Sequence, residues 1–472
     1  MSIVGAFVLP HPPLAIPDVG RGQEREIPAT IEGYNKVGKR VAELAPETIV
    51  VISPHAIMYS DYIHISPGKS ARGDMGQFRC PHVSIEKEYD VEFVKRLAEE
   101  ASEAGLSAGT EGDRKPKLDH GTILPLYYVE KYYKDYKLVR CSLSGLPLID
   151  HYEFGTYIGK VAEELERRTV VIASGDLSHR LREDGPYGFN PEGPKFDERI
   201  THDIDTGNFG DLLEFDENFC EEAGECGHRS FIEMAGSLDG KAVSPKLLSY
   251  EGIFGVGYAT AIIEVVGDDP TRHFGEEYIR KHRSAADEKR KDSDLFVRLA
   301  WLSVENYVKG GLRLSSDDPE VVKLLKEDPA AADELLNTQS GAFVSIHENG
   351  DLRGCIGTIS ATRKNLADEI LQNAVSACSR DPRFSPIVPR ELDYLDISVD
   401  VLGKAEPIDS MDQLDVKRYG VIVTHHGKRG LLLPDLEGVD TPEEQVRIAC
   451  RKAGINPNGK FDMERFEVVR HL

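Results

Sequence analysis

The sequence predicts an α/β domain followed by an α+β domain. In residues 1–267, short apolar segments of strand length alternate with amphipathic segments, an order typical of a sheet with helices on its faces. In residues 295–472, a helical segment precedes segments of alternating apolar and polar residues, which are typical of antiparallel strands. The 472 residues also exceed what one ordinary hydrophobic core holds. We therefore expect two domains, with residues 268–294 as the linker between them.

Five short apolar segments of the first domain are candidates for buried strands. Each is rich in apolar side chains and too short for a globular helix. They are IVGAFVL (3–9), TIVVIS (48–53), KLVRCSL (137–143), TVVIAS (169–174) and ATAIIEVV (259–266). Between the second and third of them, residues 90–105 place apolar side chains on one helical face and end at a glycine. Ligands of such sheets gather at the strand ends, so we expect the functional residues there.

The second domain follows a charged segment, residues 268–294, which has few apolar anchors and is expected to form a linker and the start of a helix. Residues 295–309 have the pattern of a helix, which a Gly-Gly pair would end. Residues 341–359 alternate on both sides of an Asn-Gly pair at 349–350, and this pattern predicts a β-hairpin. A further helix and two strand segments are expected at 365–381, 396–403 and 420–434.

Composition excludes several classes of function. The formal net charge is −24, from 81 acidic and 57 basic residues, which argues against nucleic acid as a partner. The longest apolar segments are far shorter than a membrane span, and the amino-terminal segment has no charged leader or cleavage site. The seven cysteines are odd in number and widely spread, which favours reduced thiols. We expect a cytoplasmic protein with no membrane partner; the oligomeric state stays open.

Histidines at the expected strand ends are the best indication of function. His11 and His55 each follow an apolar strand and lie beside a proline, and His179 follows another strand. A single histidine is more often structural, but three equivalent placements favour a site. Imidazoles from distant parts of a chain can converge as a metal centre with acid/base chemistry beside it. His120 and His228 lie in similarly compact segments.

Five motifs occur in a fixed order in the first domain: PHPP, SPH, DHGTILPL, SGDLSH and GECGHRSFIEMAGSL. With these motifs the domain resembles the class III extradiol ring-cleavage dioxygenases, the LigB superfamily, and the related MEMO proteins. The resemblance implies a non-haem Fe(II) held by two histidines and a carboxylate, which leaves room for a catechol-like substrate and O₂. By position, His11 and His55 would be the histidine ligands. His179 would be the acid/base for the substrate hydroxyl, and His120 would donate a hydrogen bond in the same pocket.

The third ligand has two candidates. Glu225 matches the glutamate of the ring-cleaving members, whereas Cys226 matches the MEMO branch, in which a cysteine takes this place. A thiolate from Cys226 would shift the metal preference from Fe(II) toward Cu or Zn. The register of the motif favours Cys226 slightly, while only Glu225 supports ordinary dioxygenation. Asp176 in SGDLSH would either orient His179 or cap the turn that follows.

The second domain resembles the AMMECR family. The motifs that carry this resemblance are LRGCIGT within 341–359, with ACSRDPRFSPI (377–387), ELDYLDISVDVL (391–402), GLLLP (430–434) and KAGI (452–455). The resemblance implies no reaction. In LRGCIGT, Cys355 has two interpretations. It could be a nucleophile or ligand whose pKa Arg353 lowers. It could also be a small buried residue while Gly354 and Gly357 relieve a bulged strand, and we favour this second interpretation.

Together the two resemblances match the AmmeMemoRadiSam system, and this resemblance implies a radical SAM partner protein. This chain has no CxxxCxxC motif, so it cannot supply the iron–sulfur cluster of such a protein itself. Two functional hypotheses follow. The first is an oxidoreductase that uses Fe(II) and O₂ on a catechol-like small molecule. The second is a MEMO-like metal-binding or adaptor protein whose site does not catalyse dioxygenation. Metal-assisted hydrolysis would use the same histidines, but no residue favours it.

Overall fold

The computed structural model describes residues 2–114, 117–348, 350–436 and 438–472. The chain forms two compact units, Met1–Ile279 and Arg280–Leu472, which are described separately. No helix in the described part of the chain is long and apolar enough to cross a membrane.

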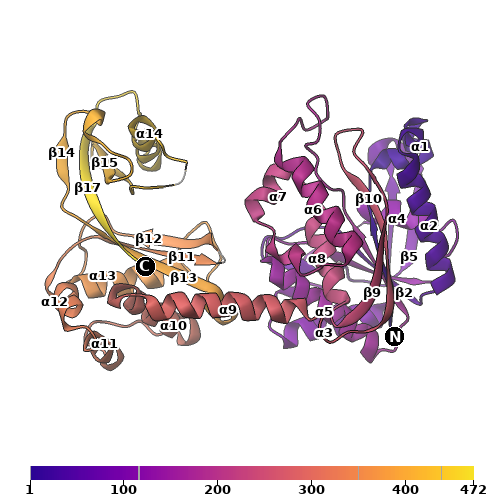
Figure 1. Cartoon of the computed structure of the whole chain (residues 1–472), viewed down its shortest axis with the longest axis horizontal. Coiled ribbons are helices and arrows are strands. Elements are labelled where there is room, and N and C mark those ends of the chain that lie inside the picture. Colours follow the sequence, from indigo (N-terminus) through magenta and orange to yellow (C-terminus); the bar gives the residue numbers. More distant parts are fainter. Residues whose placement is uncertain (1, 115–116, 349, 437) are drawn as a thin grey trace. The chain divides into compact units, whose positions relative to one another are not determined.

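A six-stranded sheet forms the centre of the first unit within the described residues, in the order β7-β2-β8-β1-β10-β9. Strands β2, β9 and β10 of this sheet are labelled in Figure 1. Strands β7, β2, β8 and β1 are parallel, and β10 and β9 join them antiparallel at one edge. The bounds are β1 (Ile3–Leu9), β2 (Thr48–Ser53), β7 (Lys137–Ser142), β8 (Thr169–Ser174), β9 (Lys241–Glu251) and β10 (Tyr258–Asp268). Every residue of β2 and β8 is buried, as expected for parallel strands covered on both faces.

Helices cover both faces of this sheet. Along β1, Ala6 and Val8 pack into one hydrophobic core, and Phe7 and Leu9 pack into the other. Helices α3, α5, α6 and α8 contribute to the first core, and α2 and α4 contribute to the second. The bounds are α1 (Pro17–Gly20), α2 (Pro28–Leu44), α3 (Val91–Glu103), α4 (His120–Val129), α5 (Leu148–Glu164), α6 (Glu192–Thr206), α7 (Glu217–Ala223) and α8 (His228–Ser237). Four further strands of this unit lie outside the central sheet: β3 (Ile63–His64), β4 (Ser70–Met75), β5 (Cys80–Glu88) and β6 (Ala108–Gly109).

Helices α5 and α8 pack with their backbones in close contact. A Cβ atom on Gly236 of α8 would lie 2.0 Å from the Tyr152 carbonyl oxygen of α5, and one on Gly155 of α5 would lie 2.1 Å from the Glu233 carbonyl oxygen of α8. Only glycine therefore fits at either position. This contact fixes α8, whose first residue, His228, lies two positions after Cys226.

The second unit is α+β. Seven antiparallel strands in the described residues follow the order β12-β11-β13-β17-β15-β16, with β14 paired to β17. Their bounds are β11 (Ala342–Glu348), β12 (Asp351–Gly357), β13 (Leu395–Leu402), β14 (Glu406–Ile408), β15 (Tyr419–His425), β16 (Lys428–Leu432) and β17 (Asp462–His471). Helices α10 to α13 pack on the β11–β13 side, and α14 packs on β15 and β16 (Figure 1). Their bounds are α10 (Leu295–Gly310), α11 (Pro319–Leu325), α12 (Pro329–Asn337), α13 (Leu366–Ser379) and α14 (Pro442–Ala453).

These observations confirm the predicted fold classes, an α/β unit followed by an α+β unit. The expected hairpin is the β11–β12 pair; Asn349 of its Asn-Gly turn lies outside the described residues, and Gly350 has a φ of 98°. The segment 268–294 consists mostly of helix α9 (Phe274–Asp292), and the Asp294 side chain then caps α10. The position of the domain boundary stays a prediction.

Candidate metal centre

Three neighbouring parallel strands place the site at one edge of the sheet. Strand β8 lies between β1 and β2, so the carboxyl ends of all three strands meet. His11 lies two residues beyond β1, His55 two residues beyond β2, and Asp176 two residues beyond β8. As a result, the Nε2 atoms of His11 and His55 are 2.9 Å apart, although 44 positions separate the residues in the sequence.

Hydrogen bonds orient the His11 ring. The Ser174 hydroxyl donates to the carbonyl oxygen of Gly121 at 2.6 Å, so its oxygen is left to accept from His11 Nδ1 at 3.0 Å. With the proton on Nδ1, His11 presents the lone pair of Nε2 toward His55. A hydrogen bond on the distal ring nitrogen is the usual way in which a protein fixes a metal-binding imidazole.

The Cys226 thiol is the third group at this point. Its Sγ lies 3.6 Å from His11 Nε2 and accepts a hydrogen bond from the Asp176 backbone N–H at 3.3 Å. Glycines bring the two loops together, because a Cβ atom on Gly175 would lie 2.2 Å from the Cα of Gly227. The donor atoms of His11, His55 and Cys226 all lie within 4.8 Å of one another.

These distances fit a metal ion. Metal–nitrogen bonds of about 2.0–2.1 Å and metal–sulfur bonds of about 2.3 Å, at angles of about 90–110°, separate two nitrogens by ~2.9–3.4 Å and nitrogen from sulfur by ~3.1–3.6 Å. The observed 2.9 Å and 3.6 Å fall within both ranges. His11 is buried and His55 is exposed, so the site is open to solvent on the His55 side. The geometry therefore suits a site with two imidazoles, one thiolate and open positions.

The structure does not bring Glu225 to this cluster. Its carboxylate accepts a hydrogen bond from the His228 backbone N–H at 2.6 Å, at the beginning of α8. It groups instead with Cys220 and His228, whose Nδ1 faces the Cys220 sulfur at 3.6 Å. His228 Nε2 donates to the Leu212 carbonyl oxygen at 2.8 Å, so this buried ring is held by structural contacts. Glu225 and Cys226 are adjacent in the sequence, but their side chains belong to different clusters.

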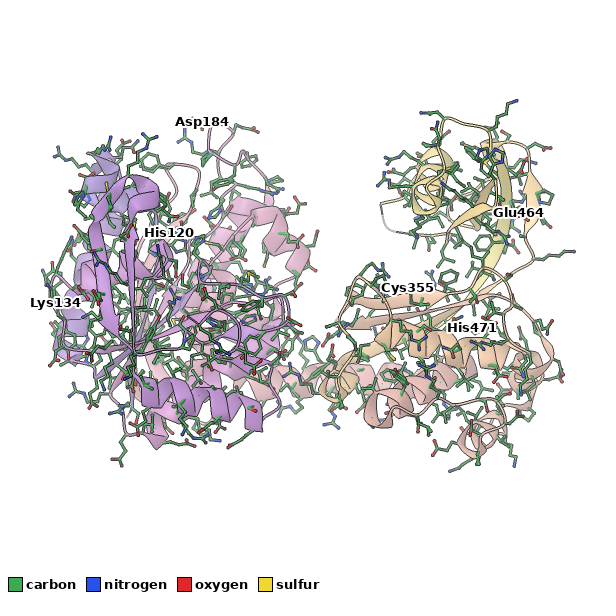
Figure 2. All side chains as sticks on the ribbon, turned by 180° about the vertical axis from the view of Figure 1, so that it is seen from behind. His120, Lys134, Asp184, Cys355, Glu464 and His471 are labelled. Carbon is green, nitrogen blue, oxygen red and sulfur yellow. The ribbon has the colours of Figure 1, made fainter. Side chains whose placement is uncertain are left out.

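His120 and His179 lie beside the cluster. The His120 side chain is labelled in Figure 2. Its ring centroid is 4.1 Å from that of His55 and 5.4 Å from that of His11. Asp119 holds His120 next to the end of β2. Its carboxylate caps α4, whose first residue is His120, and also accepts a hydrogen bond from Ser53 at the end of β2. His179 stacks on Tyr187, with ring centroids 5.1 Å apart.

The imidazoles are neutral near neutral pH. Burial, followed by the charges of the neighbouring histidines, holds the pKa of His11 well below its usual range. Burial and the proximity of His55 lower the pKa of His120 and of His179 to about 4. Their nitrogen lone pairs are therefore free for a metal or a proton. Burial raises the pKa of the Cys226 thiol, so a bound cation has to displace its proton.

Asp176 has neither of the two roles considered from the sequence. Its carboxylate accepts a hydrogen bond from the His11 backbone N–H at 2.7 Å, and its second oxygen lies 3.9 Å from His11 Nε2. The carboxylate therefore holds the turn after β1 in place. Ser174 and Asp119 are two further contributors to the site, and the sequence alone does not single them out. No pattern around either residue separates it from an ordinary strand end or helix cap.

We expect Ser174→Ala to weaken metal binding by about 10- to 100-fold, the usual effect of losing a hydrogen bond that orients a ligand. The substitution leaves His11 in place but frees its Nδ1 and its tautomer. Competition with a chelator measures the metal Kd. Ser142→Ala is the matched control, because Ser142 is buried at the end of the neighbouring strand β7 and contacts His64, not the cluster. Equal affinities for both variants would contradict the role given to Ser174.

Comparison with known proteins places both units in families. The family model described as the catalytic LigB subunit of aromatic ring-opening dioxygenase matches residues 5–261, more than half of the chain. The chain therefore belongs to this metal-dependent, dioxygenase-like family. The AMMECR1 family model matches residues 297–471, so the protein is a LigB-family domain followed by an AMMECR1 domain.

Relatives share this arrangement or part of it. Protein CA_C1420 of Clostridium acetobutylicum is 41% identical, over 100% of this chain and 99% of its own length. A protein of Thermotoga maritima is 47% identical over 37% of this chain and 96% of its own length. Among solved structures, uncharacterized protein PH0010 from Pyrococcus horikoshii has a TM-score of 0.33 and 28% identity, covering 38% of this chain and 89% of that chain. Uncharacterized protein JW3007 from Escherichia coli K12 has a TM-score of 0.36 and 16% identity, covering 55% and 99%.

Proposed function

We propose that the first unit is a non-haem metal-dependent oxidoreductase that acts with O₂ on a catechol-like small molecule. One observation carries this proposal: His11, His55 and Cys226 converge at a strand-end edge, with two further histidines beside them. Membership of a ring-opening dioxygenase family supports the reaction class. When bound, Fe(II) would supply Lewis acidity toward a diol and a redox centre for O₂.

The protein's own residues supply the proton chemistry. Since its pKa is lowered to about 4, the His179 imidazole is neutral and can accept the proton of a substrate hydroxyl. The exposed ring of Tyr187, stacked on His179, offers an aromatic face beside it. Gln77 Nε2 donates to His120 Nδ1 at 3.2 Å, which leaves the proton of His120 on Nε2. His120 can therefore donate a hydrogen bond to a substrate oxygen.

A second candidate function rests on the identity of the third ligand. The thiol of Cys226, and not the carboxylate of Glu225, lies with the two histidines. Soft thiolate ligands favour Cu or Zn, and zinc has no redox chemistry. The alternative is therefore a MEMO-like metal-binding or adaptor protein that does not turn over a diol.

Metal analysis of the full-length protein, purified without oxygen, separates the ligand candidates. We expect one metal ion per chain, retained in Glu225→Gln but bound about 100-fold more weakly in Cys226→Ala, since about 10–16 kcal/mol of binding energy is shared among four ligands in zinc-finger sites. Loss of the metal from Glu225→Gln alone would contradict the ligand set. Iron supports the oxidoreductase, and zinc supports the second candidate.

Turnover is tested with a panel of diols in the metal-loaded protein. Oxygen uptake with formation of a yellow ring-opened product is the expected signal. We expect His179→Ala to lower kcat by about 10²- to 10⁴-fold while the metal content stays unchanged, because the residue moves a proton and does not bind the metal. No oxygen uptake with any diol, in iron-loaded protein, would reject catechol cleavage and favour the second candidate.

A further inference from the structure

The first unit contains a second group of potential metal ligands, which the proposed function does not use. Within the described residues, the donor atoms of Cys220, Glu225 and His228 all lie within 4.8 Å of one another, as do those of the metal cluster described above. The three residues come from helix α7, the loop that follows it and the first residue of α8. The group therefore forms locally, within residues 220–228.

The thiol of the second unit has no comparable partners. Cys355 lies on strand β12 and is partly exposed (Figure 2). Its Sγ accepts a hydrogen bond from the Ser345 hydroxyl at 3.1 Å, and it belongs to no group of three potential ligands among the described residues. Arg353, the cation considered for it, binds Glu391 at 2.7 Å instead. A second metal site is therefore to be sought in the first unit.

His228 directs a nitrogen lone pair at the Cys220 sulfur. Its Nε2 donates to the Leu212 carbonyl oxygen at 2.8 Å, so the neutral ring carries its proton on Nε2 and none on Nδ1. The Nδ1 atom faces Cys220 Sγ at 3.6 Å. The contact with Leu212 thus fixes the tautomer as well as the ring, which is how proteins orient a metal-binding imidazole.

The distance between these two atoms is that of two zinc ligands. Zinc–nitrogen bonds of about 2.0–2.1 Å and zinc–sulfur bonds of about 2.3 Å, at a tetrahedral angle, place nitrogen and sulfur about 3.6 Å apart. The observed separation is 3.6 Å. In the cation-free form the thiol S–H can donate to Nδ1, so a proton and a metal ion compete for the same position.

The Glu225 carboxylate supplies a further ligand and a negative charge. One of its oxygens accepts a hydrogen bond from the His228 backbone N–H at 2.6 Å, and a carboxylate keeps further lone pairs for a cation. Glu225 is partly exposed, whereas Cys220 and His228 are buried, so a cation reaches the group from the Glu225 side. The nearby cation, Arg229, is paired with Glu217 at 2.9 Å. The carboxylate and a thiolate would together balance a divalent ion.

Aromatic side chains cover the group on its inner side. The His228 ring centroid lies 4.7 Å from that of Phe215 and 6.2 Å from that of Phe196, and both phenylalanines are buried. In such surroundings of low dielectric constant, a cation and its anionic ligands attract each other more strongly than in water. Burial of this kind suits a structural ion, and the mixed sulfur, nitrogen and oxygen ligands suit zinc.

We propose that Cys220, Glu225 and His228 form a second metal site, which binds Zn²⁺ and ties helix α7 to the beginning of α8. On binding, the thiol proton passes to water and sulfur bonds to zinc. We expect this site to be weaker than the first, because Arg229 follows His228 directly. The purified protein therefore keeps one ion, at the first cluster, and takes up the second when metal is supplied. The site does not depend on the reaction proposed for the first cluster.

Cobalt titration of the metal-free, full-length protein tests the proposal, because a thiolate–Co²⁺ bond gives a charge-transfer absorption that Zn²⁺ removes when it displaces cobalt. Cys226→Ala is the background, since the first cluster there has lost its sulfur. We expect this variant to show thiolate–cobalt absorption and the added substitution Cys220→Ala to abolish it. In the same background, Glu225→Gln is expected to raise the Kd about 100-fold, the share of one ligand in four-ligand zinc sites.

The matched control is Cys141→Ala in the same background. Cys141 is a buried thiol of the same unit that lies outside both groups, and its loss is expected to leave the absorption unchanged. In the otherwise unsubstituted protein, Cys220→Ala is expected to lower the bound cobalt from about two ions per chain to about one, a result that does not require Cys226→Ala to fold. Circular dichroism and the Tm monitor folding of each variant.

Four outcomes would each overturn the second site. They are no thiolate–cobalt absorption in folded Cys226→Ala, absorption that survives the addition of Cys220→Ala, an equal loss in the Cys141→Ala control, and an unchanged affinity in Glu225→Gln. Retention of one ion by the first cluster in all variants that keep Cys226 would leave the proposed function intact, so the two proposals fail separately.

Discussion

Replacing His11 with alanine is expected to remove metal binding from the first unit. His11 Nε2 is the one atom that lies close to both other donors, 2.9 Å from His55 and 3.6 Å from Cys226. Its loss leaves two donors from different loops. If each ligand contributes about a quarter of the ~10–16 kcal/mol found for four-ligand zinc sites, the Kd rises by at least about 100-fold. Metal content after dialysis against a weak chelator measures the effect.

His202→Ala is the control for this experiment. His202 lies exposed on α6, outside the cluster, and its replacement is expected to leave the metal content unchanged. Since His11 is buried, circular dichroism and the Tm have to show that His11→Ala still folds. Folded His11→Ala that keeps a full equivalent of tightly bound metal would reject the site as described here.

Much of the metal centre could be predicted because strand ends are visible in the sequence. Strands β2 and β8 are continuous apolar segments, and their observed bounds are those expected from the sequence. The residues that follow such strands meet at one edge whenever the strands are parallel. Nothing beyond this rule is needed to bring His11 near His55.

The choice between Glu225 and Cys226 could not be made in the same way. Both residues lie in a loop, where no periodicity relates neighbouring side chains. Their directions depend on the contact between Gly175 and Gly227, two loops that are 52 positions apart in the sequence. A single sequence does not reveal such a contact.

The surroundings of Cys355 show a related limit. Alternation along a strand would place Arg353 and Cys355 on the same face. The irregular register at Arg353 breaks this alternation, and Glu391 binds the guanidinium.

The second large effect is expected from Gly236→Val in the α5–α8 contact. A Cβ atom at this position would lie 2.0 Å from the Tyr152 carbonyl oxygen and 3.0 Å from the Cα of Gly155, so the two helices have to separate. Overpacking of a core costs about 1–3 kcal/mol when side chains can adjust, and a backbone carbonyl adjusts less easily. We expect a loss of about 3 kcal/mol or more in the free energy of unfolding of the first unit, and a Tm lower by about 6–12 °C.

The matched control for this prediction is Gly310→Val. Gly310 ends α10, and a Cβ atom there would meet no heavy atom within 4 Å, so we expect a change within about 0.5 kcal/mol. Because α8 begins two residues after Cys226, separating the helices also moves the thiol. Gly236→Val is therefore expected to weaken metal binding as well, even at temperatures at which the unit remains folded. A variant with unchanged Tm and metal affinity would show that α5 and α8 do not pack through these glycines.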